Sequence, residues 1–190
     1  MMLRESLIRN LCLLKKTSYI ENKIYKQFFS FVTESHDLVR DRNKKNHLCC
    51  FFLPVHQKSN SVYLVHHKKA MDWIPPGGHI DRYELPVDTI KREFLEELSY
   101  MLTSEKVTLA NISIKRINKK THPCKTHYDL WYTVECREKT PFIYLEDEFL
   151  DAGWFSLQKA LSKMKYIMYR KIVRKIAAGF TDANQSSHAV

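Results

Sequence analysis

Three glutamates at positions 93, 96 and 97 form the strongest chemical pattern in this chain of 190 residues. Their i, i+3 and i+4 spacing places all three carboxylates on one face of a helix. Like charges at this spacing repel one another, and a divalent cation would offset the repulsion. Mg²⁺ and Mn²⁺ prefer oxygen ligands, and Mg²⁺ is usually held by a few carboxylates together with water and substrate phosphates. Taken alone, the three glutamates also fit a solvated acidic face that pairs with Arg92.

The residues before the three glutamates extend the pattern. Gly78 is followed after five residues by Glu84 and, after seven more, by the pair Arg92-Glu93. This spacing resembles the Nudix box, the signature of the Nudix hydrolases, at every charged position. The one departure is Ser99, which stands where the family has Gly. The family Gly ends the box helix in a left-handed conformation, which costs a non-Gly residue on the order of 1 kcal/mol.

The resemblance continues outside the box and covers residues 47 to 180. The segment from Trp73 to His79 is similar to the Trp-x-x-Pro-Gly-Gly-His approach that is common in bacterial Nudix hydrolases. The segment from His127 to Leu130 resembles a His-x-Asp strand of one subgroup. Glu148 lies where many members carry an extra catalytic or metal-binding glutamate.

The resemblance implies a Mg²⁺-dependent (or Mn²⁺-dependent) enzyme that hydrolyses a pyrophosphate bond in a nucleoside diphosphate-linked substrate, of the nucleotide or nucleotide-sugar type. Which glutamate acts as the general base, and how many ions bind, stay open, with Glu148 favoured as the base. An ion pair between Glu84 and Arg92 should orient the helix, and Gly78 should shape the loop. We therefore expect catalytic roles for Glu93, Glu97 and Glu148, metal ligation by Glu93, Glu96 and Glu97, and substrate contacts from Trp73, His79 and His127.

Two other functions remain open at this stage. An RNA 5′-end pyrophosphohydrolase would suit the net charge, but such members usually show Pro-Gln-Gly-Gly before the box and this chain has Pro75-Pro76 followed by two glycines. A Nudix-fold binding module without turnover is the second alternative, which the intact glutamates disfavour. A metal site built on histidines is disfavoured because no pair has the helical His-x-x-x-His spacing.

Composition restricts the class of partner and the expected cellular compartment, but it does not identify a substrate. The chain has 31 Lys and Arg against 21 Asp and Glu, a formal net charge of +10, which suggests an anionic partner. We expect a phosphorylated small molecule, with RNA less favoured; a homodimer, common in the family, stays open. No apolar run approaches the roughly 20 residues of a transmembrane helix. Five cysteines without paired spacing predict free thiols and a cytoplasmic protein.

Hydrophobic periodicity predicts short strands between long helices, and hence an α/β or α+β fold. With the family resemblance, this becomes a Nudix-type α/β/α sandwich with a mixed sheet and an N-terminal helical extension. We expect an extension over residues 1–46, a Nudix domain over 47–180 and a flexible tail over 181–190. The expected helices span 1–16, 19–40, 86–101 and 156–178, the last ending at Gly179. The expected strands span 47–55, 61–67, 107–117, 126–136 and 154–155.

Overall fold

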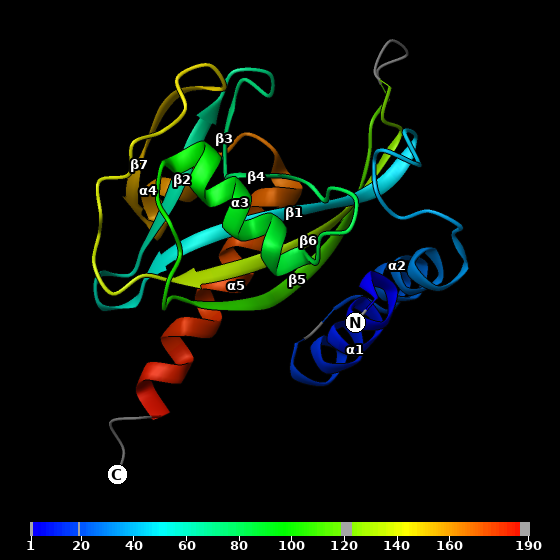
Figure 1. Ribbon diagram of the computed structural model, residues 1–190. Coiled ribbons are helices and arrows are strands. Elements are labelled where there is room, and N and C mark those ends of the chain that lie inside the picture. The colour runs from blue at the N-terminus through cyan, green and yellow to red at the C-terminus, as the bar shows by residue number, and fades with distance from the viewer. Residues whose placement is uncertain (1, 19, 119–122, 187–190) are drawn as a thin grey trace. The chain divides into compact units, whose positions relative to one another are not determined.

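The computed structural model describes residues 2–18, 20–118 and 123–186, with side chains described as far as residue 178. Within the described residues, a pair of helices precedes four strands, one helix separates these from three further strands, and a second pair of helices follows (Figure 1). The helices are α1 (Leu3–Thr17), α2 (Asn22–Glu34), α3 (Pro86–Leu98), α4 (Leu157–Lys163) and α5 (Ile167–Ser186), with a 3-10 turn η1 (Gln57–Ser59). The strands are β1 (Asn46–His56), β2 (Ser61–His67), β3 (Asp72–Ile74), β4 (Gly77–His79), β5 (Lys106–Arg116), β6 (Thr126–Glu135) and β7 (Phe149–Ser156).

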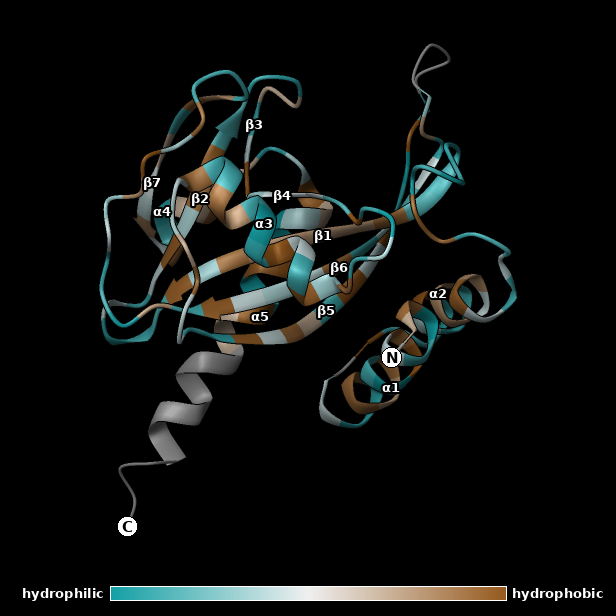
Figure 2. Cartoon of the chain, viewed as in Figure 1, coloured by the Kyte–Doolittle hydropathy of each residue, from teal (hydrophilic) through white to brown (hydrophobic). Residues whose placement is uncertain are grey.

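The strands join in one sheet with the order β3-β2-β1-β6-β5; β4 pairs with β1, and β7 pairs with β2. Strand β1 is largely hydrophobic in Figure 2, and its residues from Leu48 to Cys50 are almost fully buried. A strand buried on both faces is expected to read as a continuous apolar run. The presence of helices together with one sheet confirms the predicted α/β or α+β class.

Two compact units divide the chain, one comprising residues 1–51, 77–92 and 109–132 and the other comprising 52–76, 93–108 and 133–190. In the first unit, α1 and α2 pack through apolar side chains that include Leu7, Leu11 and Phe28. Phe31 of α2 stacks on Tyr128 of β6 with ring centroids 3.7 Å apart. This stacking attaches the N-terminal helices to strand β6. The predicted domain boundaries remain predictions, and residues 187–190 of the predicted tail lie outside the described residues.

The second unit has an aromatic core. Phe52 of β1 stacks on Phe94 of α3 at 4.9 Å, and Phe142 meets Phe94 edge-on at 5.2 Å. Strand β7 pairs with β2 along its length, from Ser61 opposite Ser156 to Val65 opposite Ala152. The sequence predicted only a two-residue strand, at 154–155. The longer strand could not be predicted, because its pairing with β2, almost ninety residues earlier in the chain, leaves no local sequence pattern.

The predicted helix over 156–178 is wrong in two respects. It is two helices, and the second, α5, continues past Gly179 to Ser186. The break has a physical cause in Asp72, which is buried. Its carboxylate accepts hydrogen bonds from the backbone N–H groups of Lys165 and Tyr166 at 2.7 and 2.9 Å, directly before α5. These bonds hold the residues just before the first turn of α5, and they place a negative charge near the N-terminus of this helix, where it is favourable.

Helix α3 ends at Leu98, earlier than the predicted Met101, and Ser99 follows in the left-handed region with φ of 48°. A glycine adopts this conformation without the steric cost that Ser99 bears. Replacing Ser99 with glycine should therefore raise the free energy of unfolding by about 0.5–1 kcal/mol. Urea denaturation would measure the change. The same replacement at exposed Ser162, inside α4, should instead lower stability, and equal effects at the two sites would contradict the explanation.

Candidate active site

Helix α3 carries the three box glutamates with the predicted helical spacing. Its apolar stripe of Ile90, Phe94 and Leu98 is fully buried, which fixes the rotation of the helix about its axis. Glu97 is only 5% exposed, whereas Glu96 is exposed and Glu93 is half-buried. The helix therefore presents a row of carboxylates that runs from the protein interior to the surface.

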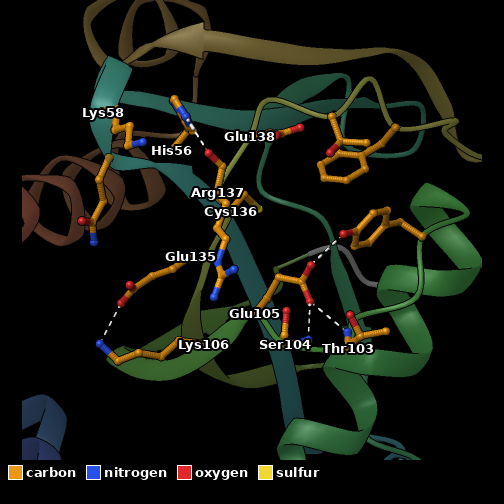
Figure 3. Close-up of a pocket in the computed structure, with 14 residues that line it drawn as sticks. His56, Lys58, Thr103, Ser104, Glu105, Lys106, Glu135, Cys136, Arg137 and Glu138 are labelled. Atoms are coloured by element: carbon orange, nitrogen blue, oxygen red, sulfur yellow. Dashed lines mark hydrogen bonds and ion pairs between the residues drawn. The ribbon is translucent and has the colours of Figure 1, made fainter.

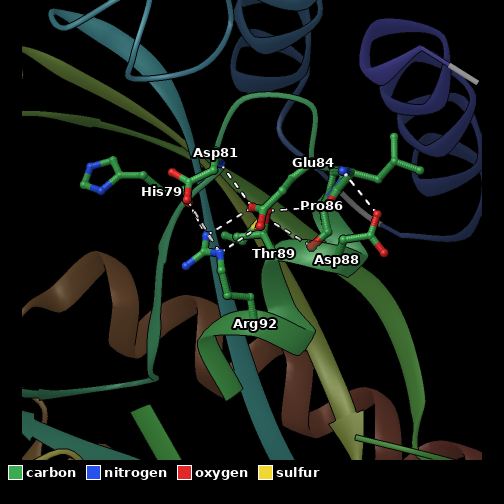
Figure 4. Close-up of polar contacts among 9 residues, drawn as sticks. His79, Asp81, Glu84, Pro86, Asp88, Thr89 and Arg92 are labelled. Atoms are coloured by element: carbon green, nitrogen blue, oxygen red, sulfur yellow. Dashed lines mark hydrogen bonds and ion pairs between the residues drawn. The ribbon is translucent and has the colours of Figure 1, made fainter. Parts of the chain in front are cut away.

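The loop before α3 is tied to the helix by the ion pair between Glu84 and Arg92 (Figure 4). Arg92 Nε donates to Glu84 Oε1 at 2.8 Å and Arg92 Nη2 donates to Oε2 at 3.1 Å, so the pair is bidentate. Thr89 Oγ1 adds a hydrogen bond to Oε2 at 2.8 Å. Arg92 Nη2 also donates to the carbonyl oxygen of His79 at 3.0 Å. One guanidinium thus links the helix, the loop and β4, a contact that fixes the geometry of the box.

The hydrogen bond from Arg92 is the largest cause of a lowered pKa at Glu84, and it outweighs the opposing effect of partial burial. A carboxylate with a lowered folded-state pKa contributes stability above its unfolded-state pKa of about 4.3 and loses it as the pH falls through the folded value. Glu84→Gln should therefore cost about 1–3 kcal/mol of unfolding free energy at pH 7. The difference from the wild type should shrink towards pH 3.

Chemical denaturation at pH 7 and at pH 3 would check this dependence. Glu34→Gln removes an exposed carboxylate at the end of α2 and serves as the control. It should leave stability nearly unchanged at both pH values. A loss at Glu84 that is equally large at both pH values would show that packing, and not the charged form of the carboxyl, accounts for the stabilisation.

Glu148, the predicted glutamate outside the box, lies just before β7 in the second unit. Its backbone N–H donates to the Leu145 carbonyl at 3.1 Å, and the Leu145 N–H donates to the Glu97 carbonyl at 2.8 Å. Its own carbonyl accepts from Lys68 N at 2.9 Å. Backbone hydrogen bonds thus connect the segment of Glu148 to the C-terminal turn of α3. Its carboxylate is partly exposed and lies 4.0 Å from Lys69 Nζ.

Trp73, a predicted substrate contact, is 8% exposed in the second unit. Its ring stacks on His66 with centroids 5.2 Å apart and an interplanar angle of 9°, and Phe155 meets it edge-on at 5.0 Å. Lys163 Nζ lies 4.2 Å from the ring centroid. These three side chains already surround the indole ring of Trp73. A base that stacked on Trp73 would have to displace one of them.

The other two predicted contacts, His79 and His127, lie close together in the first unit. Their ring centroids are 5.3 Å apart, and the ring of His47 lies 4.9 Å from that of His79 and 5.0 Å from that of His127. The sequence did not predict this grouping, because the three residues belong to three different strands. Their shared position at a strand end was the available signal, since strand ends meet at one edge of a sheet.

A pocket of about 600 Å³ was also not predicted (Figure 3). It lies within the second unit, and the box glutamates are not among its lining residues. Glu105 on its wall accepts hydrogen bonds from Tyr100 Oη at 2.6 Å and from the Thr103 and Ser104 N–H groups at 2.8 and 3.0 Å. The hydrogen bond to Glu105 raises the pKa of Tyr100 to about 12. This carboxylate therefore holds the turn at residues 103–105 together.

Comparisons with known proteins agree with the box and the fold. The family model for the NUDIX domain matches residues 44–176. No curated protein sequence matches the chain. Similar solved structures include the dihydroneopterin triphosphate pyrophosphohydrolase of E. coli, with 13% identity and a TM-score of 0.62 over 70% of this chain and 95% of that one. An Ap4A hydrolase from C. elegans has 16% identity and a TM-score of 0.59, over 73% and 98%.

A MutT NUDIX hydrolase from Burkholderia pseudomallei has 20% identity and a TM-score of 0.55, over 69% of this chain and 98% of its own. At these identities the structural likeness shows the fold, whereas the family model covers well over half of the chain. The chain therefore belongs to the Nudix family. Within the part of the chain that the structure describes, no helix has the length and apolar character to cross a membrane.

Proposed function

We propose that this protein is a Mg²⁺-dependent Nudix hydrolase that cleaves a pyrophosphate bond in a nucleoside diphosphate-linked substrate. The observation that carries the proposal is the arrangement of the charged box residues on α3 and in the loop before it. Glu84 and Arg92 fix the loop against the helix, and Glu93, Glu96 and Glu97 follow on one helical face with Glu97 buried. An ion pair alone would not require three clustered carboxylates.

The donor set suits a hard divalent cation. Glu93, Glu96 and Glu97 offer carboxylate oxygens, the ligand type that Mg²⁺ and Mn²⁺ prefer. These three residues would hold the ion, with Glu93 and Glu97 as the principal ligands and Glu96 in support. A bound ion supplies charge neutralisation for a diphosphate and lowers the pKa of a coordinated water. Arg92 keeps the glutamates in place from its position one residue before Glu93.

Glu148 is our proposed general base. Its segment is hydrogen-bonded to the end of α3 at Glu97, and its partly exposed carboxylate is accessible to water. An exposed carboxylate keeps the ability to accept a proton from the attacking water and to release it to solvent afterwards. Glu93 and Glu97 would keep their negative charge for the cation throughout. The roles of ligand and base would thus belong to different residues.

A hydrolysis screen tests the proposal. It would measure phosphate or nucleotide release from nucleoside diphosphate sugars, dNTPs, NADH, Ap4A, dihydroneopterin triphosphate and capped or triphosphorylated RNA, each with Mg²⁺ and with EDTA. We expect metal-dependent release from at least one nucleotide or nucleotide-sugar substrate. Release from RNA alone would favour the 5′-end activity. Absence of release from every substrate, with Mg²⁺ or Mn²⁺, would indicate a binding module and overturn the proposal.

A further inference from the structure

A second cluster of potential metal ligands lies in the first unit. The cluster offers nitrogen and sulfur donor atoms, in contrast to the carboxylate oxygens of the box glutamates. It contains three histidines and one cysteine, and one donor atom from each lies within 4.8 Å of those from the others. His47 and Cys124 are fully buried, and His79 and His127 are half-buried. The Nε2 atoms of all three histidines are buried. We propose that His47, His79, Cys124 and His127 form a structural zinc site.

Strand geometry brings these residues together. Strand β1 pairs with β4 so that Cys49 stands opposite His79. Because side chains alternate along a strand, His47 lies on the same face of β1 as Cys49 and is therefore a diagonal neighbour of His79. Strand β6 presents His127 near its start. The cluster thus collects ligands from three strands.

The fourth ligand is held next to the first by backbone hydrogen bonds. The N–H groups of Lys125 and Thr126 both donate to the carbonyl of Lys45, at 2.7 and 3.0 Å. These bonds fix the residue after Cys124 against the residues just before His47. The cysteine therefore reaches the histidines through an ordered connection, although the sequence separates Cys124 from His47 by 77 positions.

The surroundings also suit a metal. His47 Nδ1 is 2.8 Å from the Asn43 carbonyl, to which it donates in the tautomer that leaves Nε2 for a metal. Asp129 is fully buried and offers a carboxylate oxygen within 4.8 Å of His127 and Cys49 donor atoms. One cysteine thiolate and one aspartate would balance the two charges of a zinc ion. Arg40 opposes a cation, because its Nη1 lies 3.5 Å from His79 Nδ1. Its side chain is exposed, so it would turn towards solvent when an ion binds.

The types of ligand atom indicate which metal ion would bind and whether the site is structural or catalytic. Imidazole and thiolate are the donors that Zn²⁺ favours, whereas Mg²⁺ prefers oxygen. Four protein ligands are typical of a closed structural site, because a catalytic zinc keeps one position for water. Tetrahedral bonds of about 2.0–2.3 Å place neighbouring ligand atoms roughly 3.4–3.7 Å apart, so the cluster need contract by only about 1 Å. Binding would release the thiol proton of Cys124.

Zinc here would also support the box. His79 ends β4, and its carbonyl accepts the hydrogen bond from Arg92. An ion that holds the His79 ring would restrain the same residue to which Arg92 is anchored. The proposed role is therefore to clamp β1, β4 and β6 around the start of the box loop. It is independent of the pyrophosphohydrolase proposal, because zinc binding is measured without any substrate.

The test uses full-length protein without a histidine tag. Elemental analysis should find one zinc per chain, and Co²⁺ added to the metal-free protein should give a thiolate-to-cobalt charge-transfer band. Cys124→Ser should remove that band and weaken zinc binding by more than the roughly 10–100-fold that loss of an outer-shell partner causes. Asp129→Asn should weaken binding within that range. Cys12→Ser and His36→Gln, at exposed positions, should bind as the wild type does.

The cobalt band of the wild type needs no variant, so the test survives a variant that fails to fold. Metal-free wild-type protein that shows no thiolate band with one equivalent of Co²⁺ would overturn the site. Equal zinc affinity of the wild type and Cys124→Ser would overturn it as well. Hydrolysis that is lost after zinc removal and regained only with zinc would support the clamp on the box.

Discussion

Replacement of Glu97 by glutamine is expected to lower Mg²⁺-dependent turnover by on the order of 10³-fold, which corresponds to about 4 kcal/mol of lost charge stabilisation. Glutamine has nearly the same shape as glutamate, so the packing around this buried position should survive. The change removes one negative charge from the proposed ligand set. The loss should therefore appear in kcat and in Mg²⁺ affinity together. Steady-state kinetics at several Mg²⁺ concentrations would measure both.

Three further variants make the result specific to the proposed roles. Glu96→Gln should cost only about tenfold, because Glu96 is exposed and its charge interacts more weakly in high dielectric. Glu148→Gln should lower kcat by on the order of 10²- to 10⁴-fold without weakening Mn²⁺ binding, since it removes a base and not a principal ligand. Glu146→Gln, at an exposed neighbour of Glu148, should leave turnover unchanged. Wild-type turnover in Glu97→Gln would refute the assignment of Glu97.

Replacement of Gly77 by alanine is expected to lower the free energy of unfolding by about 3 kcal/mol or more. Gly77 has φ of 145°, which side-chain-bearing residues rarely adopt. A Cβ atom there would lie 2.1 Å from the Cys50 carbonyl oxygen and 2.8 Å from Phe51 Cα, and both of these atoms are backbone. The substitution must therefore push β4 away from β1, and with it Gly78 at the start of the box.

Gly153→Ala is the matched control for Gly77→Ala. Gly153 also lies in a strand, but a Cβ atom there would meet only the Phe155 ring, at 3.7 Å, which is ordinary van der Waals contact. Its unfolding free energy should change by less than about 1 kcal/mol. Urea unfolding of the two variants gives the comparison. Similar effects of the two substitutions would show that the close approach to Cys50 is not what requires glycine at position 77.

Features with short sequence separation could be predicted from the sequence. The spacing of Glu93, Glu96 and Glu97 specified one helical face, and the ion pair between Glu84 and Arg92 joins residues only eight positions apart. The match to the NUDIX family model confirmed the predicted family, and the similar solved structures confirmed the predicted α+β fold. The helical face and the ion pair could be predicted for the same reason, because a helix and the loop before it follow local rules of spacing and capping.

Features that depend on distant residues could not be predicted in this way. Asp72 interrupts the predicted last helix from more than ninety positions away. The cluster of His47, His79, Cys124 and His127 depends on strand order and register, neither of which has a local signature. The sequence disfavoured a histidine site because no pair of histidines has the helical His-x-x-x-His spacing. That criterion applies to one helix and is uninformative for ligands that come from separate strands.

Isotope transfer from ¹⁸O-labelled water tests the central claim most directly. The wild type and Glu97→Gln would be incubated with the best substrate of the screen in labelled water, and the products analysed by mass spectrometry. If water attacks phosphorus, we predict one labelled oxygen in one phosphate-containing product, formed by the wild type with Mg²⁺ and nearly absent with EDTA or in Glu97→Gln. Product that forms at equal rates in all of these samples, or that carries no label, would contradict the proposed hydrolysis at the box.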